Sequence, residues 1–221
     1  MLGLGSIVTV VTTMAAKIGP AIATAVKTVG PLIMEGIKYI SPVLQNVFGA
    51  LGAIKPDEKF EDLGDRAYQA AEKGINPEKF DSYDEYMQEI RNFELDPEES
   101  KKNVEAKTAM GVIVGGRSLE EKLNLPDTTT VSMVRSIMAN SFTPTFFTET
   151  RIQAILSEGS TVSFSRIESY LEGNLDPTTK QYVEKGLFEI EKEINPEVTQ
   201  DQFTDTLDKL RNSPSLDNPN T

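Results

Sequence analysis

Carboxylates are the residues of this chain that occur in clusters suited to acid–base or metal chemistry. The clusters are short and lie in the second quarter of the sequence: Asp57-Glu58, Glu61-Asp62 and Asp96-Pro97-Glu98-Glu99. None has the Asp-x-Asp-x-Asp-Gly spacing of an EF-hand calcium loop. Acidic residues also stabilise the first turn of a helix, where the macrodipole favours negative charge. We therefore interpret these clusters as helix starts and solvated surface, and expect no bound metal.

The residue types that most often carry catalysis are missing from the sequence. The chain of 221 residues has no Cys, no His and no Trp. It therefore lacks the commonest general base and the thiolate nucleophile. It also contains no GxSxG, P-loop or GxGxxG motif. Paired carboxylates or a Ser/Lys pair remain possible, but no motif supports them, so we expect a non-enzymatic protein without a cofactor.

A second set of residues, in the first 54 positions, is regularly spaced. Pro20, Pro31 and Pro42 stand 11 residues apart, and Lys27 and Lys38 each lie four residues before the next proline. Eleven residues are close to three turns of an α-helix, so residues repeated at this interval share one face. This spacing is suited to shaping a binding surface rather than to covalent chemistry.

These residues lie in an apolar segment that we predict to be helical. Residues 1–54 include 31 apolar side chains, seven glycines and three prolines. On a helical wheel the polar side chains fall into one narrow sector, the polar stripe, marked by Lys17, Lys27 and Lys38. The longest uncharged runs, 1–16 and 39–54, are shorter than the roughly 20 apolar residues of a simple membrane-spanning helix. We therefore predict an amphipathic helical segment.

The rest of this wheel forms the predicted membrane- or partner-binding face. It is represented by Leu4, Ile7, Val11, Ile18, Ile22, Val29, Ile33, Ile40, Val47 and Leu51. An interior proline costs about 3 kcal/mol, whereas burying one large apolar side chain contributes about 1.5–3 kcal/mol. Packing can therefore override the prolines, and we predict a helix that is bent or jointed at Pro20, Pro31 and Pro42, with a concave apolar face.

The identity of the apolar material that covers this face stays open at this point. The face can be buried in the protein's own core or in a homo-oligomer. It can equally insert into a lipid bilayer, at its surface or as an oligomeric pore lined by the polar stripe. A third possibility is permanent packing against a different protein.

Beyond residue 54 the composition changes sharply. Residues 1–54 contain three lysines and one glutamate, a net charge of +2. Because the net charge of the whole chain is −12, the other 167 residues carry −14. Such an acidic surface repels phosphate backbones, so we expect no nucleic-acid partner. We predict an acidic helical domain over 55–212 and a disordered tail over 213–221, hence an all-α protein with 1–54 as its apolar part.

Several helix ends in the acidic region can be predicted from capping residues. Gly74 is suited to end one helix, and Asp176-Pro177 to begin another. Ser118 with Glu121 and Thr199 with Gln202 have the spacing of capping boxes. The sequence Glu-Lys-Gly-Ile-Asn-Pro-Glu at 72–78 recurs at 191–197 with one difference. We interpret this repeat as a shared way to end one helix and begin the next, with a duplicated binding hairpin as the alternative.

Two functional hypotheses remain. In the first, the protein interacts with membranes, as a pore-forming or membrane-penetrating factor, through residues 1–54. In the second, it is a structural or adaptor component of a large assembly whose apolar N-terminal helices pack against a protein partner. Both predict a homo-oligomer or larger assembly. The sequence has no conventional signal peptide, so the localisation expected is membrane association or a secretion route without one.

Overall fold

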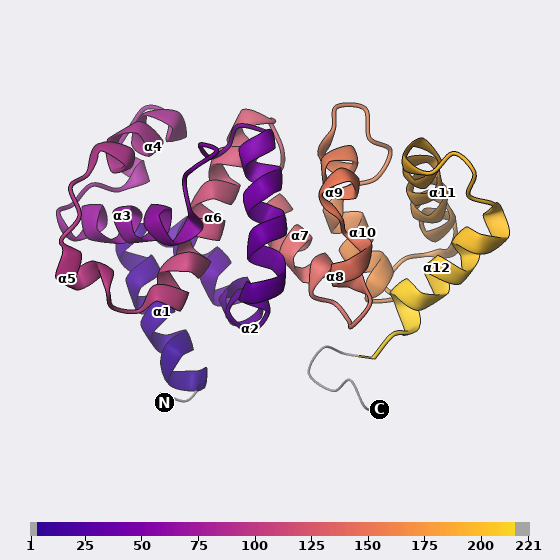
Figure 1. The fold of residues 1–221 in the computed structure, drawn as a ribbon, viewed down its shortest axis with the longest axis horizontal. Helices are drawn as coiled ribbons and strands as arrows, with labels where there is room; N and C mark the ends of the chain where they lie inside the picture. The colour runs from indigo at the N-terminus through magenta and orange to yellow at the C-terminus, as the bar shows by residue number, and fades with distance from the viewer. Residues whose placement is uncertain (1–3, 215–221) are drawn as a thin grey trace. The chain divides into compact units, whose positions relative to one another are not determined.

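The computed structural model describes residues 4–214, and the side chains of 9–37 and 40–214. All regular structure in this range is helical, with no strand, which confirms the predicted all-α class. The chain divides into two compact units, residues 1–131 and 132–221, and the division falls within α7 (Thr129–Ile137). Figure 1 gives the order of the helices along the chain.

The first unit begins with two apolar helices. They are α1 (Leu4–Ile18) and α2 (Pro20–Ala50), separated by one extended residue, Gly19. Pro20 occupies the first turn of α2, where its missing N–H would have no helical partner. The helix then continues through Pro31 and Pro42, and Figure 1 shows that it changes direction along its length. Prolines are a common physical cause of such bends, because each removes one bond of the helical ladder.

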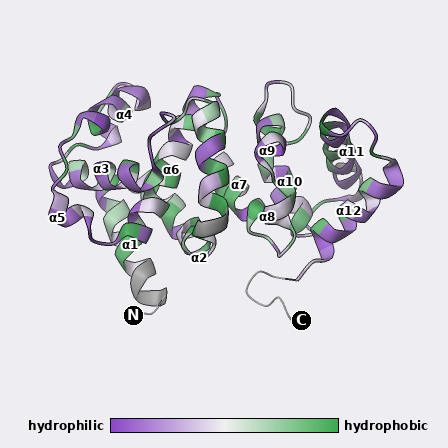
Figure 2. Ribbon diagram, in the orientation of Figure 1, coloured by the Kyte–Doolittle hydropathy of each residue, from purple (hydrophilic) through white to green (hydrophobic). Residues whose placement is uncertain are grey.

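The acidic elements of the same unit follow. They are α3 (Phe60–Glu72), the 3₁₀ turn η1 (Pro77–Lys79), α4 (Tyr83–Asn92), α5 (Pro97–Ser100) and α6 (Val104–Lys122). The composition boundary at Lys55 therefore falls inside the first unit. Helix α6 is the buried centre of this unit: it packs against α2, α3 and α1, and residues Ala109–Gly116 are all buried. Figure 2 shows the hydrophobic residues along α6 and on parts of α1 and α2, whereas α4 and α5 are largely hydrophilic.

The second unit is built from short helices around aromatic side chains. After α7 come α8 (Thr143–Phe146), α9 (Glu149–Leu156), α10 (Phe164–Leu171), α11 (Pro177–Ile194) and α12 (Gln200–Asn212). Phe147 contacts Phe146 at a ring-centroid distance of 5.1 Å and Phe164 at 5.8 Å. The Arg151 guanidinium covers the Phe146 ring and is paired with Glu191 of α11 at 2.6 Å. An apolar centre tied by one ion pair thus holds α8–α11 together.

Several predicted helix ends are confirmed. At the end of α3, the N–H of Gly74 donates to the carbonyl of Ala71 and that of Ile75 to Ala70, the Schellman pattern that glycine at φ 79° permits. The Asp176 side chain accepts from the N–H groups of Thr178 and Thr179.

The two predicted capping boxes have different outcomes. The reciprocal bonds of Thr199 and Gln202 open α12. The box predicted at Ser118 is wrong: Ser118 is buried inside the continuous helix α6, where its hydroxyl donates to the Ala53 carbonyl.

Both copies of the Asn-Pro-Glu repeat separate two helices. The first copy follows α3 and leads to α4, and the second follows α11 and leads to α12. The helices after the break differ in their start, because Ser82 caps α4 and Thr199 caps α12. Residues 215–221 of the predicted tail lie outside the described residues.

Candidate functional site

The first candidate site is the N-terminal hairpin, defined here as α1 and α2. Its two helices fold back on each other, since Gly30 of α2 lies next to Val11 of α1. The predicted apolar face points into the first unit. The side chains of seven of its residues are between 0 and 2 % exposed: Val11, Ile18, Ile22, Val29, Ile33, Ile40 and Val47. Leu51 is half-buried, and the side chains of Leu4 and Ile7 lie outside the described range.

The hairpin rests on α3 and α6. Helix α1 packs against both, and α2 packs against α6. At the end of α2, Phe48 makes an edge-to-face contact with Phe60 of α3 at 5.4 Å. A Cβ on Gly115 of α6 would lie 3.4 Å from the Phe48 ring, so α2 and α6 approach closely at this point. The apolar face is therefore covered by the protein's own helices in this structure.

The outer surface of the hairpin carries the polar stripe. Thr13, Lys17, Thr24 and Lys27 are exposed, and the hydroxyls of Thr13 and Thr24 donate to the backbone carbonyls four residues earlier. The side chain of Lys38, the third predicted lysine, lies outside the described range. The hairpin thus has a buried apolar side and an exposed side of threonine, alanine and lysine.

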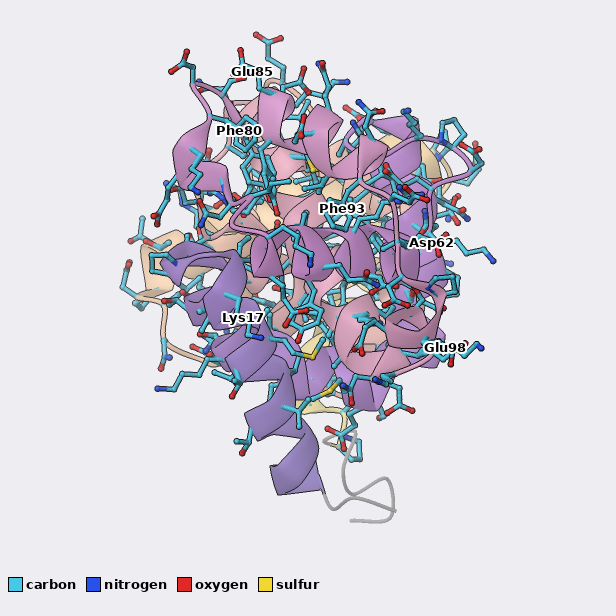
Figure 3. All side chains as sticks on the ribbon, turned by 90° about the vertical axis from the view of Figure 1, so that its left-hand side faces the viewer. Lys17, Asp62, Phe80, Glu85, Phe93 and Glu98 are labelled. Carbon is cyan, nitrogen blue, oxygen red and sulfur yellow. The ribbon has the colours of Figure 1, made fainter. Side chains whose placement is uncertain are left out.

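Lys17, the one charged residue in the sequence of α1, is tied to α3 (Figure 3). Its ammonium lies 2.6 Å from the Glu72 carboxylate and 5.2 Å from the centre of the Tyr68 ring. The Tyr68 hydroxyl donates to the same Glu72 oxygen at 2.9 Å. These bonds raise the pKa of Lys17 and lower that of Glu72, while burial raises the pKa of Tyr68. We call this cluster the Lys17 triad.

The other end of the hairpin is held by a denser set of polar contacts. The Ala53 carbonyl accepts from Ser118 at 3.0 Å and from Arg91 at 3.4 Å. Arg91 also forms a two-pronged ion pair with Glu58, with Nη2 at 2.9 Å. Within α2, the Gln45 amide bonds the Glu58 carbonyl and the Phe60 N–H. The connection from α2 to α3 is therefore fixed by side chains from α2, α4 and α6.

Helices α3 and α6 beneath the hairpin contain an ion pair that sequence reasoning missed. Lys107 and Asp65 are 2.8 Å apart, with side chains 1 % and 5 % exposed. Gly64 and Gly111 lie at the same crossing: a Cβ on either would be 1.8 Å from a backbone oxygen of the other helix. The sequence signal was the run of small and apolar residues after Lys107, which places that lysine at the edge of a buried stretch.

A second candidate site is a groove in the first unit with a volume of about 390 Å³. Pro42 of α2, Phe60 of α3 and Val104 of α6 supply its apolar walls, and Glu61 and Glu105 lie at its edge beside Lys59. Val104 is 38 % exposed, which makes it one of two exposed large apolar side chains in the described part of the chain. A volume of this size accommodates one or two large side chains.

Several of the acidic residues with the types suited to chemistry make structural contacts instead. Asp96 caps α5, and Glu58 pairs with Arg91. Glu120 is buried, which raises the pKa of its carboxyl, but it accepts the Thr130 N–H and pairs with Arg117. Within the described residues no group of three or more carboxylates is arranged to hold a metal ion.

Two further findings bear on function. Among the described residues, no helix combines the length and apolar character required to cross a bilayer. No known family model, curated protein or solved structure matches this chain.

Proposed function

We propose that this protein is a non-enzymatic, membrane-interacting helical protein whose N-terminal hairpin is stored against α3 and α6. The observation that supports it is the hairpin itself: the most apolar stretch of the chain forms two adjacent helices with one continuous buried face. Seven large side chains on this face are almost completely removed from water. Lipid tails can replace the covering helices, because both surroundings exclude water from the same apolar surface.

The distribution of polar residues indicates how the hairpin would lie in a membrane. Its exposed side carries threonines and lysines, which can bond to headgroups, and its buried side carries Ile, Val and Leu. A helix with this division lies in the interface, with the apolar face toward the acyl chains. Three lysines and one glutamate also give the hairpin a net charge of +2, opposite in sign to the rest of the chain, although three lysines attract anionic lipid only weakly.

Vesicle flotation of the full chain tests this function. We would compare phosphatidylcholine vesicles with vesicles containing phosphatidylglycerol, at pH values from 7 to 4. We expect the protein to float with vesicles under at least one condition, and hydrogen exchange in α1 and α2 to change more than exchange in the second unit. A protein that stays unbound under every condition overturns the proposal.

The groove at Pro42 favours a second candidate function, a component of a protein assembly. An exposed Val104 beside a 390 Å³ apolar groove is suited to receive an apolar side chain of a second copy of this chain. Light scattering after gel filtration tests this assembly function by measuring the mass of the wild type and of V104E. The control is Y182S, at the other exposed large apolar residue of the described part of the chain. The assembly function predicts a defined oligomer that V104E alone dissociates, and a monomeric wild type contradicts it.

A further inference from the structure

The two ends of the hairpin are secured unequally. At the end that leads to α3, the Arg91–Glu58 pair has side chains only 16 % and 10 % exposed, and the Ala53 carbonyl accepts bonds from Arg91 of α4 and Ser118 of α6. At the corner between α1 and α2, the Lys17–Glu72 pair is 44 % and 37 % exposed. Water and ions reach the second pair directly, and exposed pairs contribute little stability. Of the two ends, the corner is therefore held less firmly by polar contacts.

The corner also has the backbone geometry for a separation. Gly19 is extended and follows the last turn of α1, so the two helices are joined by one non-helical residue. Lys17 lies two residues before this joint and holds α1 to the last turn of α3. When this contact is lost, α1 is still held by the apolar contacts of its buried face. A lipid surface can replace these apolar contacts.

We propose that the Lys17 triad is a latch that keeps the hairpin closed, and that acid weakens it. This inference rests on the proposed membrane function, because it describes how the stored hairpin would be released. Lys17 comes from α1, and Tyr68 and Glu72 come from α3. Two further charged groups bear on this corner: Lys73, which follows Glu72 in the chain and lowers its pKa, and Glu78 of η1, whose carboxylate lies beside Gly19.

The direction of the acid effect follows from the Glu72 carboxyl. The Lys17 and Tyr68 hydrogen bonds lower its pKa below the ordinary value of 4.5. The folded state then binds this proton less readily than the unfolded state, so the latch contributes stability above about pH 4.5 and loses it as pH falls through the lowered pKa. Protonation removes the charged acceptor that lies 2.6 Å from the Lys17 ammonium, and neither Lys73 nor Tyr68 supplies a carboxylate in its place.

A reversible tether tests the latch cleanly, because the chain has no cysteine of its own. We would make K17C/E72C and join the two thiols with a short bis-maleimide that contains a reducible disulfide. The matched control is R135C/E168C, which replaces an ion pair of similar length between α7 and α10 in the second unit. Circular dichroism before and after tethering checks that both variants keep their helices.

The latch predicts that tethered K17C/E72C does not float with phosphatidylglycerol vesicles and that reduction of the tether restores flotation. Tethered R135C/E168C should float like the wild type. In addition, E72Q should bind vesicles about two- to fivefold faster than the wild type at pH 7, whereas E168Q should not. The difference between E72Q and the wild type should shrink as pH falls below about 4.5.

The outcomes separate the latch from the function on which it rests. If wild type floats and the tethered latch variant floats equally well, the latch is wrong and membrane binding stands. If wild type and untethered K17C/E72C both stay unbound at every pH, the membrane function itself fails. Equal pH dependence of wild type and E72Q would also overturn the latch.

Discussion

Two helix pairs in the first unit are held together by different forces. The hairpin α1–α2 packs through interlocking apolar side chains and is tied at its corner by an exposed ion pair. The pair α3–α6 meets backbone to backbone at Gly64 and Gly111, beside the buried pair of Asp65 and Lys107. Apolar contacts can be exchanged for other apolar contacts at little cost, whereas lipid tails cannot replace the backbone contact of α3 with α6 or the bond between Lys107 and Asp65. We therefore expect the first pair to be exchangeable and the second to stay together.

Removing one charge from the permanent pair should have the largest effect. Lys107→Met leaves the Asp65 carboxylate buried without its cation, although the Gln69 amide still donates to it. An uncompensated buried charge costs about 3–5 kcal/mol of unfolding free energy. Urea unfolding followed by circular dichroism measures the loss. Lys180→Met, which removes a lysine 3.9 Å from Glu184 on an exposed surface, is the control and should change little. Equal losses for both variants would contradict the contrast between the two helix pairs.

A single methyl group at the crossing should have the next largest effect. In Gly111→Ala the new Cβ would lie 1.8 Å from the Phe60 carbonyl oxygen, so the two backbones must separate. Overpacking of this kind costs about 1–3 kcal/mol and occasionally more. Gly49→Ala, where a Cβ meets no atom within 4 Å, should be neutral or stabilising, because alanine favours helix over glycine. Thermal unfolding of the two variants gives the comparison, and a stable Gly111→Ala would show that this crossing is not tight.

The hairpin should tolerate a change of shape at a buried position. Ile33 is completely buried, but Ile33→Val removes one methyl group and should cost only about 0.5–1.5 kcal/mol. Urea unfolding measures the loss of unfolding free energy in this variant as well. The test is whether the loss decreases in the order Lys107→Met, Gly111→Ala, Ile33→Val. If Ile33→Val destabilised the protein more than Gly111→Ala, the hairpin rather than the α3–α6 pair would be the rigid part of the unit.

The smallest effect should come from the exposed triad. Glu72→Gln removes the charge that Lys17 binds, so the variant should melt slightly below the wild type at pH 7. Because the pKa of Glu72 is lowered in the folded state, this difference should shrink as pH falls below about 4.5 and vanish only below the lowered pKa. Melting curves at a series of pH values from 7 to 3 measure it. A difference that grows with acid would mean that another carboxylate dominates this corner.

Sequence patterns predicted the helices better than they predicted their burial. Hydrophobic periodicity and caps identified the all-α class, Gly74 as a helix end and Thr199 as a helix start. The helical wheel identified the apolar face of 1–54, but a wheel describes one helix and cannot say which other helix covers it. Ser118 has the type and spacing of a cap, yet it lies within α6 because the preceding Gly115-Gly116 continues the helix at a close contact with Ile54 and Thr130. Lysine is almost never fully buried without a partner, and the pairing of Lys107 with Asp65 across two helices makes its burial possible.

The tyrosines give this chain a spectroscopic property that follows from their placement. With no tryptophan in the sequence, near-ultraviolet absorbance and fluorescence come chiefly from six tyrosines. Burial raises the pKa of Tyr83 and Tyr86 in the first unit and of Tyr170 in the second well above the ordinary value of 10. These three rings therefore form tyrosinate only when their surroundings open. An alkaline absorbance titration, with phenylalanine replacing Tyr170 or Tyr86 in turn, would record the opening of each unit without an added label.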